Sequence, residues 1–422
     1  MDRNATPRHL LLLSTLFLVY VSCGIIAMLP GPALPVLAAH TDVPLDITGW
    51  IFTANALGFA LGVMISGILS TRINSKYLLM IGVSVIGIAA IIIPWTHIFA
   101  LLLAAQFIAG IGFGAVDVGI NVIATLTFHN VLGEILNTLH SAFGLGALIG
   151  PLLLSLSLKF VNESIWAFAA GTVIALIAFV LLVPQHIPAI VRQNPPSEQQ
   201  SMPSRSRVLA HAALWFMALQ MFLYVGAETS FSGWVATATS QSAKVSLVIA
   251  APTAAMFWLG LTSGRLLGAQ LLKHAQLNEN RLLYLSFIGG GLSGLLVAVF
   301  TGQLWLDFAA SLLMGLFLGP IFPGIIAIAS RRFVYALNII STVMLLSGGA
   351  AGTIFPVLIG TFITHIGIAP GMAFPAIMTL LIALPFFLAR EQPLLQFNRN
   401  VPTIKAQETS STTNDCSKEH IL

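Results

Sequence analysis

Charge is what this sequence has least of. Only 8% of its 422 residues are Asp, Glu, Lys or Arg, whereas 57% are hydrophobic, and soluble domains carry about 25% charged residues. A water-soluble protein is therefore excluded. The basic residues behind the net charge of +4 are scattered over short loops, so no nucleic-acid partner is expected.

Cysteine and the signatures of soluble enzymes are scarce as well. Cys23 and Cys416 are isolated, which indicates no disulfide framework. The glycine runs at 110–114 and 289–291 lie inside apolar segments, so neither is a phosphate-binding Walker loop. No cluster of His, Cys, Asp or Glu has metal-ligand spacing. We expect no enzyme, no bound metal and no organic cofactor.

Long apolar runs are what the sequence has instead. A helix needs roughly 20 apolar residues to cross a bilayer, and twelve segments qualify: 10–38, 47–70, 76–94, 98–126, 132–157, 165–184, 208–238, 245–272, 282–300, 304–329, 335–363 and 370–389. The polar stretch 185–207 separates them six and six, as a cytosolic linker would. This pattern predicts an all-α membrane protein with bundles at 1–184 and 208–389 and a disordered cytosolic tail at 390–422.

The basic residues indicate the orientation in the membrane. With the N-terminus in the cytosol, every Lys and Arg lies on the cytosolic side except Lys159, Lys244 and the intramembrane Arg265. Such a bias is typical of cytosolic loops. We expect a multi-pass protein of the plasma or inner membrane with both termini cytosolic. Four tryptophans are expected in an outer aromatic belt: Trp50, Trp95, Trp166 and Trp234.

The two halves of the sequence are related by an internal repeat. A shift of 205 residues aligns Gly110, Gly114, Gly119, Ile120, Ile123, Ala124 and Phe128 with Gly315, Gly319, Gly324, Ile325, Ile328, Ala329 and Phe333. Six predicted helices separate equivalent positions, so both halves have the same orientation. The repeat therefore predicts two parallel six-helix bundles.

One polar pair stands outside this repeat. Asp117 aligns with Phe322, and Asn121, one helical turn after Asp117 on the same face, aligns with Ile326. A carboxylate inside a membrane is costly unless it faces a partner or a water-filled cavity. Because the pair occurs in one half only, it favours a functional role over packing.

A second intramembrane carboxylate is Glu228, which lies between Gly226 and Gly233. Glycine-interrupted helices often form transporter sites, and Gln220, two turns earlier, lies on nearly the same face. Burial disfavours the charged form of a carboxylate. Such a group can load a proton, hold a cation or accept hydrogen bonds from a polyol. The alternative is a protonated side chain bonded to a neighbouring helix.

Other polar residues have less specific interpretations. His140 could relay protons or be a core histidine with its hydrogen bonds satisfied. Arg265 could reach the membrane interface or lock an inner gate. Asp307, at the outer edge of its segment, is expected to be solvated.

Several motifs together resemble the major facilitator superfamily, and within it the fucose–galactose–glucose symporter branch, with sodium-dependent glucose transporter-like and bypass-of-stop-codon-like proteins. They are Gly112-Phe-Gly-Ala-Val-Asp117-Val-Gly-Ile-Asn121, Asn137-Thr-Leu-His140 with the glycine-rich run to Pro151, Tyr224-Val-Gly-Ala-Glu228, Phe257-Trp-Leu-Gly-Leu-Thr-Ser-Gly-Arg265 and Gly319-Pro-Ile-Phe-Pro323. The resemblance implies the major facilitator fold. It also implies a substrate or proton role for Asp117.

The sequence departs from that branch in two places. The first helix has no acid, because residues 25–31 are apolar. The loop between the second and third helices has Thr71 where the superfamily usually has aspartate, beside Arg72. Arg72 is a candidate gating residue, and whether the usual charge network of this loop forms with Thr71 in place of the aspartate is left open.

The leading hypothesis is a monomeric secondary active transporter that moves a small polar solute, a sugar by the resemblance, with a coupled proton or Na⁺. It places the coupling ion or substrate at Asp117, hydrogen-bond partners at Asn121 and Gln220, and a second acid at Glu228. The solute and the lipid bilayer are the only partners expected. One alternative is a proton-coupled exporter of drugs or metabolites, suggested by an acid and aromatic residues in the second bundle. Another is a non-transporting receptor or scaffold, suggested by the altered loop and the polar tail.

Overall fold

The structure is a computed structural model that describes residues 7–70, 72–128, 131–185, 187, 208–274, 278–300, 302–333 and 336–391. The regular elements in these ranges are all helices, and twelve stretches are long and apolar enough to cross a membrane. The predictions of an all-α protein and of twelve spans are confirmed. The predicted linker and tail fall almost wholly outside the described ranges.

The first half contains eight helices. They are α1 (Pro7–Met28), α2 (Pro30–Thr41), α3 (Leu45–Thr48), α4 (Trp50–Leu69), α5 (Ser75–Trp95), α6 (Phe99–Thr127), α7 (Leu132–Val161) and α8 (Ile165–Leu182). The second half contains α10 (Ala212–Ser242), α11 (Leu247–Ala250), α12 (Pro252–His274), α13 (Glu279–Val299), α14 (Leu304–Leu318), α15 (Ile321–Arg332), α16 (Leu337–His365), α17 (Ile368–Leu381) and α18 (Ala383–Glu391).

Proline explains several of the breaks between these helices. A proline has no amide hydrogen and its ring clashes with the preceding turn, so it begins or interrupts a helix. Pro30 begins α2, Pro252 begins α12, and Pro320 separates α14 from α15. The equivalent span of the first half, α6, runs unbroken from Phe99 to Thr127.

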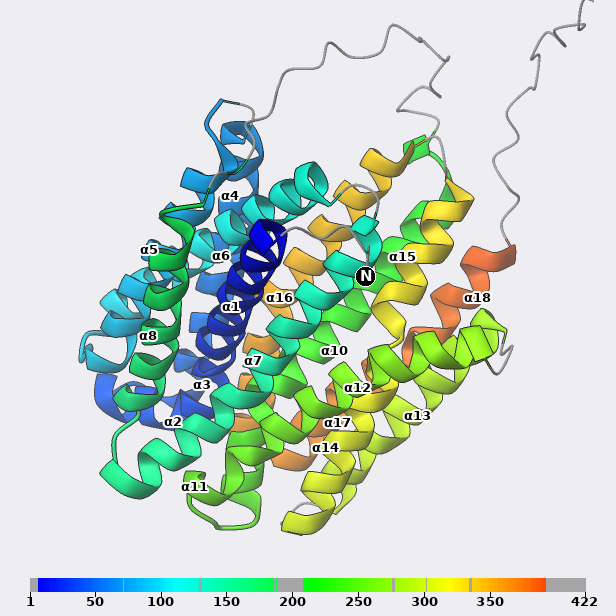
Figure 1. Cartoon of the computed structure of the whole chain (residues 1–422). Coiled ribbons are helices and arrows are strands. Elements are labelled where there is room, and N and C mark those ends of the chain that lie inside the picture. Colours follow the sequence, from blue (N-terminus) through cyan, green and yellow to red (C-terminus); the bar gives the residue numbers. More distant parts are fainter. Residues whose placement is uncertain are drawn as a thin grey trace, which may run out of the picture.

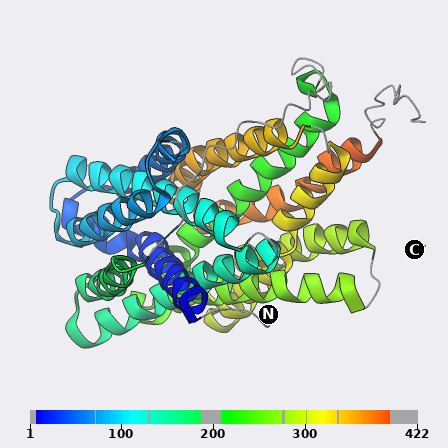
Figure 2. The same ribbon diagram turned by 45° about the horizontal axis from the view of Figure 1, so that its top comes forward.

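The helices form two bundles with the same internal packing. In the first half α4 packs on α6, α1 on α7, and α5 on α8; in the second half α12 packs on α14, α10 on α16, and α13 on α17. Each pair of the first half thus has its counterpart in the second. Figures 1 and 2 show the blue and cyan helices on one side of the molecule and the yellow helices on the other. The predicted parallel repeat is confirmed.

Glycine makes the closest helix pairs possible. A Cβ atom on Gly110 of α6 would lie 2.1 Å from the main-chain oxygen of Asn55 in α4. A Cβ on Gly315 of α14, which the repeat aligns with Gly110, would lie 2.0 Å from the main-chain oxygen of Phe257 in α12. Only glycine permits backbones to approach this closely, so the shared glycines form a duplicated packing scaffold.

The two bundles meet on the predicted outer side. His365 of α16 pairs with Asp46 of α3 at 3.3 Å, and the Thr53 hydroxyl of α4 donates to the main-chain oxygen of Thr353 at 2.5 Å. The rings of Phe52 and Trp234 lie 6.4 Å apart. These contacts, made by Asp46, Phe52 and Thr53 of the first bundle with Trp234, Thr353 and His365 of the second, are called the outer seam below.

The same helices separate toward the predicted cytosolic side. A Cβ on Gly352 of α16 would still meet Ala56 of α4 at 3.7 Å, whereas one on Gly349, a turn further inward on nearly the same face, would meet nothing within 4 Å. Contacts between α7 and α12 continue near the middle, where the rings of Phe143 and Trp258 lie 6.3 Å apart. The bundles are therefore closed at the outer seam, and the contact between α16 and α4 does not continue to Gly349.

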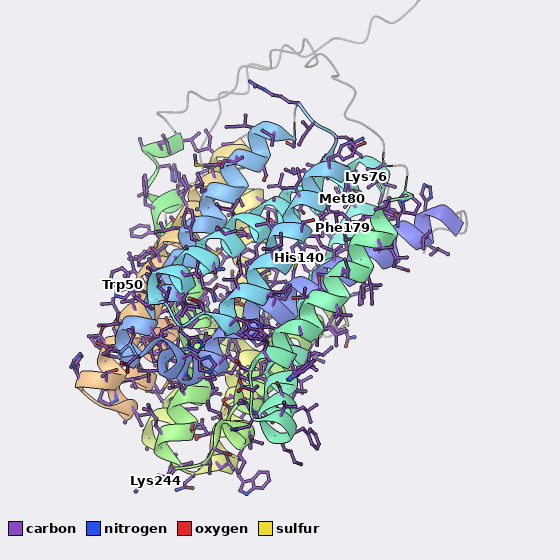
Figure 3. All side chains as sticks on the ribbon, turned by 90° about the vertical axis from the view of Figure 1, so that its left-hand side faces the viewer. Trp50, Lys76, Met80, His140, Phe179 and Lys244 are labelled. Atoms are coloured by element: carbon purple, nitrogen blue, oxygen red, sulfur yellow. The ribbon has the colours of Figure 1, made fainter. Side chains whose placement is uncertain are left out.

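The tryptophans correct one expectation. Trp50, Trp95 and Trp166 are exposed near the predicted outer ends of their helices, and Figure 3 shows Trp50 at the edge of the molecule. Trp234 is fully buried, and its indole nitrogen donates to the main-chain oxygen of Pro356 at 2.7 Å. Its assignment to the aromatic belt was wrong, because the outer end of α10 faces the other bundle and not lipid.

Candidate functional site

Asp117 lies on the face of α6 that approaches α1. Tyr20 of α1 donates its hydroxyl hydrogen to Oδ1 of Asp117 at 2.9 Å. The tyrosine itself is buried, while the carboxylate is half-buried. Asp117 thus has one strong partner, which lowers the cost of keeping it in the membrane, and keeps part of its surface accessible.

Asn121 bonds to its own helix and not to the carboxylate of Asp117. Its side-chain nitrogen donates to the main-chain oxygen of Asp117 at 2.8 Å. One turn further, the Thr125 hydroxyl donates to the main-chain oxygen of Asn121, also at 2.8 Å. Since these donors are used within the helix, the oxygens of all three side chains can accept hydrogen bonds from a ligand. The result is a stripe of acceptors along α6.

His140 of α7 joins Asp117 to the second bundle. Its ring lies 5.5 Å from the ring of Tyr20, and the imidazole interacts electrostatically with both Asp117 and Arg265. Figure 3 shows His140 near the middle of the molecule. The side chain is exposed although it lies within a membrane-spanning helix, so it is placed where a proton or a ligand could reach it.

The second bundle contributes an ion pair. Arg265 of α12 lies 3.7 Å from Oε1 of Glu228 in α10, and the two side chains are 33% and 14% exposed. Tyr224, one turn before Glu228, interacts electrostatically with both groups. A buried pair of this kind is nearly neutral as a unit. The structure thus assigns Arg265 a definite partner, Glu228.

A hydrogen bond, two electrostatic interactions and an ion pair relate these groups in one polar chain across the two bundles. It runs from Tyr20 through Asp117 and His140 to Arg265 and Glu228. The charges of Arg265 and Glu228 cancel. When His140 is neutral, the net formal charge of the polar chain is therefore the single negative charge of Asp117. Such an arrangement favours a cation or a neutral hydrogen-bonding solute over an anion.

The family follows from a match along most of the chain. The family model of the Major Facilitator Superfamily matches residues 16–348. The chain belongs to this superfamily. The "Sodium-dependent glucose transporter 1" of Xenopus laevis is 26% identical over 318 residues, which are 69% of this chain and 64% of that protein. The "Glucose/mannose transporter GlcP" of Bacillus subtilis (strain 168) is 24% identical over 356 residues, 81% of this chain and 85% of that protein.

The superfamily fold is also found among solved structures. A bacterial homolog of the human lysosomal transporter Spinster, in an inward-facing and occupied conformation, matches with a TM-score of 0.74 at 14% identity, over 92% of this chain and 98% of that one. The superfamily match and these relatives identify transporters and not enzymes. The chain spans less than two thirds of the Xenopus protein's length.

Tyr20 is the site residue that the sequence analysis missed. The repeat does contain a signal for it, because a shift of 204 residues aligns Tyr20-Val21 with Tyr224-Val225. Both halves of this chain therefore place a tyrosine beside the charged groups of their own bundle. A tyrosine in an apolar run is easily taken for packing, and only its contact with another helix shows its role.

Three predicted residues lie apart from this chain of contacts. Gln220 is buried, and among the described residues its side-chain nitrogen has no hydrogen-bond partner. Arg72 is exposed in the turn between α4 and α5, and Thr71 beside it lies outside the described residues. Asp307 is only 1% exposed, so the expectation that it is solvated was wrong.

No group of three or more His, Cys, Asp or Glu side chains that could hold a metal ion occurs in the ranges that the structure describes. The roles of Asp117, Asn121, Gln220, Glu228, His140, Arg265 and Arg72 remain predictions.

Proposed function

We propose that the protein is a secondary active transporter that carries a sugar together with a proton or Na⁺ by alternating access. The observation that supports this most is Asp117. It is a half-buried carboxylate inside the first bundle that accepts a hydrogen bond from Tyr20 and interacts electrostatically with His140, which also interacts with Arg265 of the other bundle. The proposal places a monomeric chain in the plasma or inner membrane with both termini in the cytosol.

Cation binding at Asp117 supplies the coupling in this proposal. The empty carboxylate is charged, and moving it through a closed, water-free state is costly. A bound cation neutralises it, and the solute then bonds to the acceptors on α6. Loading both ligands favours the occluded state over either open state by differential affinity. The bundles then rock about the site, which requires the outer seam to open and close.

His140 and Arg265 connect the loading of Asp117 to the second bundle. The imidazole interacts with a carboxylate on one side and a guanidinium on the other. When Asp117 becomes neutral, its attraction for His140 falls while the repulsion between a charged His140 and Arg265 remains. Since Asp117 and His140 both belong to the first bundle, neutralisation at Asp117 leaves the repulsion between a charged His140 and Arg265 of the second bundle uncompensated and favours a rearrangement of the bundles.

Two observations support a sugar as the solute. The stripe of acceptors formed by Asp117, Asn121 and Thr125 suits the hydroxyl groups of a polyol. The named relatives are a sodium-dependent glucose transporter and a glucose/mannose transporter. The first of these names also fits Na⁺ as the coupling ion, and the accessible His140 fits a proton.

Transport into proteoliposomes tests the proposal. Labelled hexoses and deoxyhexoses are offered under an imposed pH or Na⁺ gradient. We expect accumulation by the wild type, and exchange without accumulation by Asp117→Asn, which keeps the hydrogen-bonding shape and removes the charge. Glu163→Gln, at an exposed acid of the α7–α8 turn, is the matched control and should accumulate sugar normally. Gradient-driven accumulation by Asp117→Asn would disprove the coupling role.

A proton-coupled exporter is the second candidate. Aromatic contacts lie close to the charged groups: Phe143 with Trp258 at 6.3 Å and Tyr224 with Phe322 at 6.0 Å between ring centres. Such surfaces suit a flat apolar cargo. Efflux of a cationic dye from everted vesicles, with no uptake of any sugar, would select this function.

A further inference from the structure

Asp307 occupies a second polar site, in the second bundle near the predicted outer end of α14. Its side chain is 1% exposed, and neither carboxylate oxygen has a hydrogen bond to any residue that the structure describes. A buried carboxylate without a partner is strongly destabilising. A ligand that satisfies these oxygens would remove this cost, as would protonation of the carboxyl group.

Two hydroxyl groups share this environment. Thr239 of α10 lies close enough to the carboxyl group of Asp307 to interact with it, although without a hydrogen bond of normal geometry. Ser311 lies one turn after Asp307 on the same face of α14. Thr239 is 1% exposed and Ser311 is 0% exposed. Within the described ranges neither hydroxyl oxygen has a hydrogen-bond partner. Four side-chain oxygens from three residues are thus buried and unsatisfied where α10 passes α14.

Some other hydroxyls of α10 and α12 are satisfied within their own helix, although those of Ser230 and Thr237 on α10 also have no partner among the described residues. The hydroxyl of Thr229 donates to the main-chain oxygen of Val225 at 2.7 Å, and that of Thr253 donates to Ala250 at 2.7 Å. This bond to the preceding turn is the usual way to satisfy a hydroxyl inside a helix. Because Thr239 and Ser311 leave it unmade, their oxygens are free to act as ligands.

We propose that Asp307, Ser311 and Thr239 bind a monovalent cation, Na⁺. Carboxylate and hydroxyl oxygens are the ligands that hard cations prefer. The single carboxylate matches a single positive charge, whereas a divalent ion takes more acidic ligands. The surrounding side chains of Val235, Ala310 and Met314 are buried and apolar, so a charge mismatch would not be screened by water.

Among the residues that the structure describes, no basic side chain forms an ion pair with Asp307. Lys244, the nearest basic residue along α10 and its following turn, is exposed and lies at the edge of the molecule in Figure 3. The ion pairs found among the described residues are Arg265–Glu228, Arg331–Glu279 and His365–Asp46, and none includes Asp307. The carboxylate therefore remains available to an ion.

The site is distinct from the Asp117 site, and its existence does not depend on the proposed transport activity. It does have a structural connection to the outer seam, because Thr239 lies little more than one turn after Trp234 on α10. An ion that joins Thr239 to α14 fixes the outer end of α10, and so fixes the position of Trp234.

Thermal unfolding of the purified protein tests the site. The unfolding midpoint is measured at constant ionic strength in NaCl, KCl and choline chloride. An ion that binds only the folded state raises the midpoint in a saturable way, so we expect Na⁺ to stabilise the wild type relative to choline. Asp307→Asn should lose this effect. Ser311→Ala and Thr239→Val should each weaken the apparent Na⁺ affinity about tenfold.

Because Na⁺ at Asp117 would also stabilise the wild type, the Asp307, Ser311 and Thr239 variants are compared in the Asp117→Asn background, which should keep the Na⁺ effect of the Asp307 site even where it loses coupled transport. The proposal is overturned if Na⁺ stabilises no more than choline, which indicates a protonated Asp307. It is also overturned if Asp307→Asn keeps the full effect. Should Asp307→Asn fail to fold, ²²Na⁺ binding to Ser311→Ala and Thr239→Val decides the question, because unchanged affinity in both excludes the site.

Discussion

A single hydroxyl distinguishes Asp117 from a carboxylate that simply faces water. Tyr20 donates to Oδ1 at 2.9 Å from a different helix, and a donor of this kind stabilises the charged form of an acid. The bond holds the empty carboxylate in a defined position. In the proposed cycle this bond would help the site to release its ion as well as to bind it.

Replacing Tyr20 by Phe should therefore change the pH response of transport. The ring would keep its contacts with His140 and Phe143, while the charged carboxylate would lose its donor. We expect the pH midpoint of gradient-driven uptake to rise by about one to two units, because protonation becomes easier. The initial uptake rate is measured as a function of pH on the cation-loading side.

Tyr224→Phe is the matched control, because the repeat aligns Tyr224 with Tyr20 but no hydrogen bond to Asp117 is present there. It should leave the pH midpoint in place, whatever it does to the rate. An unchanged midpoint in Tyr20→Phe would show that the hydroxyl has only a packing role.

At the scale of elements, glycines let neighbouring helices pack closely and so keep each bundle rigid. The α4–α6 and α12–α14 pairs are held at distances that leave no room for a side chain. Packing of this closeness replaces the hydrophobic effect as a source of stability inside a bilayer. Each bundle can then move as a unit while the contacts between bundles change.

Alanine substitutions at Gly110 and Gly67 should have opposite effects. A Cβ at Gly110 would overlap the α4 backbone, whereas one at Gly67, near the end of α4, would meet nothing within 4 Å. We expect Gly110→Ala to lower the thermal unfolding midpoint in detergent by several degrees, since overpacking costs about 1–3 kcal/mol. Gly67→Ala should be neutral or stabilising by up to about 1 kcal/mol from helix propensity. Equal effects at both positions would contradict this account of the scaffold.

The number and order of elements could be predicted from the sequence, and their contacts only in part. A long apolar run cannot remain in water, so all twelve spans were found, and the repeat of glycines gave the parallel bundles. Trp234 and Asp307 were misplaced for one reason. The sequence marks the end of a helix but does not tell whether that end faces water, lipid or the other bundle. Tyr20 was missed because its partner is 97 residues away in the chain.

At the scale of the whole molecule, the outer seam determines which side is closed. Its Asp46–His365 pair joins α3 to α16 but is partly exposed, with 63% of the histidine side chain accessible. Exposed ion pairs contribute about 0.2–1 kcal/mol. The seam should therefore be easy to open, as an alternating-access cycle requires.

Asp46→Asn should increase the population that is open at the seam by about two- to fivefold. Spin labels at the exposed positions Trp50 and Ile366, in a variant that lacks Cys23 and Cys416, report the separation of the two bundles there. The fraction of molecules with a long distance between the two labels is measured by pulsed electron–electron double resonance. Glu163→Gln removes an acid that makes no contact between bundles and is the control. A distribution unchanged by Asp46→Asn would show that the pair does not help to close the seam.

The break at Pro320 makes the two halves mechanically unequal. In the first half this span is one unbroken helix, α6, which carries Asp117. The second half has two shorter helices, α14 and α15, in its place. The helix nearer the predicted cytosolic side, α15, carries Phe322 at the position equivalent to Asp117. Because only the second half has this break, we expect bending to be concentrated between α14 and α15. In the proposed cycle the first bundle would hold the ion at Asp117 while α15 moves around the cargo.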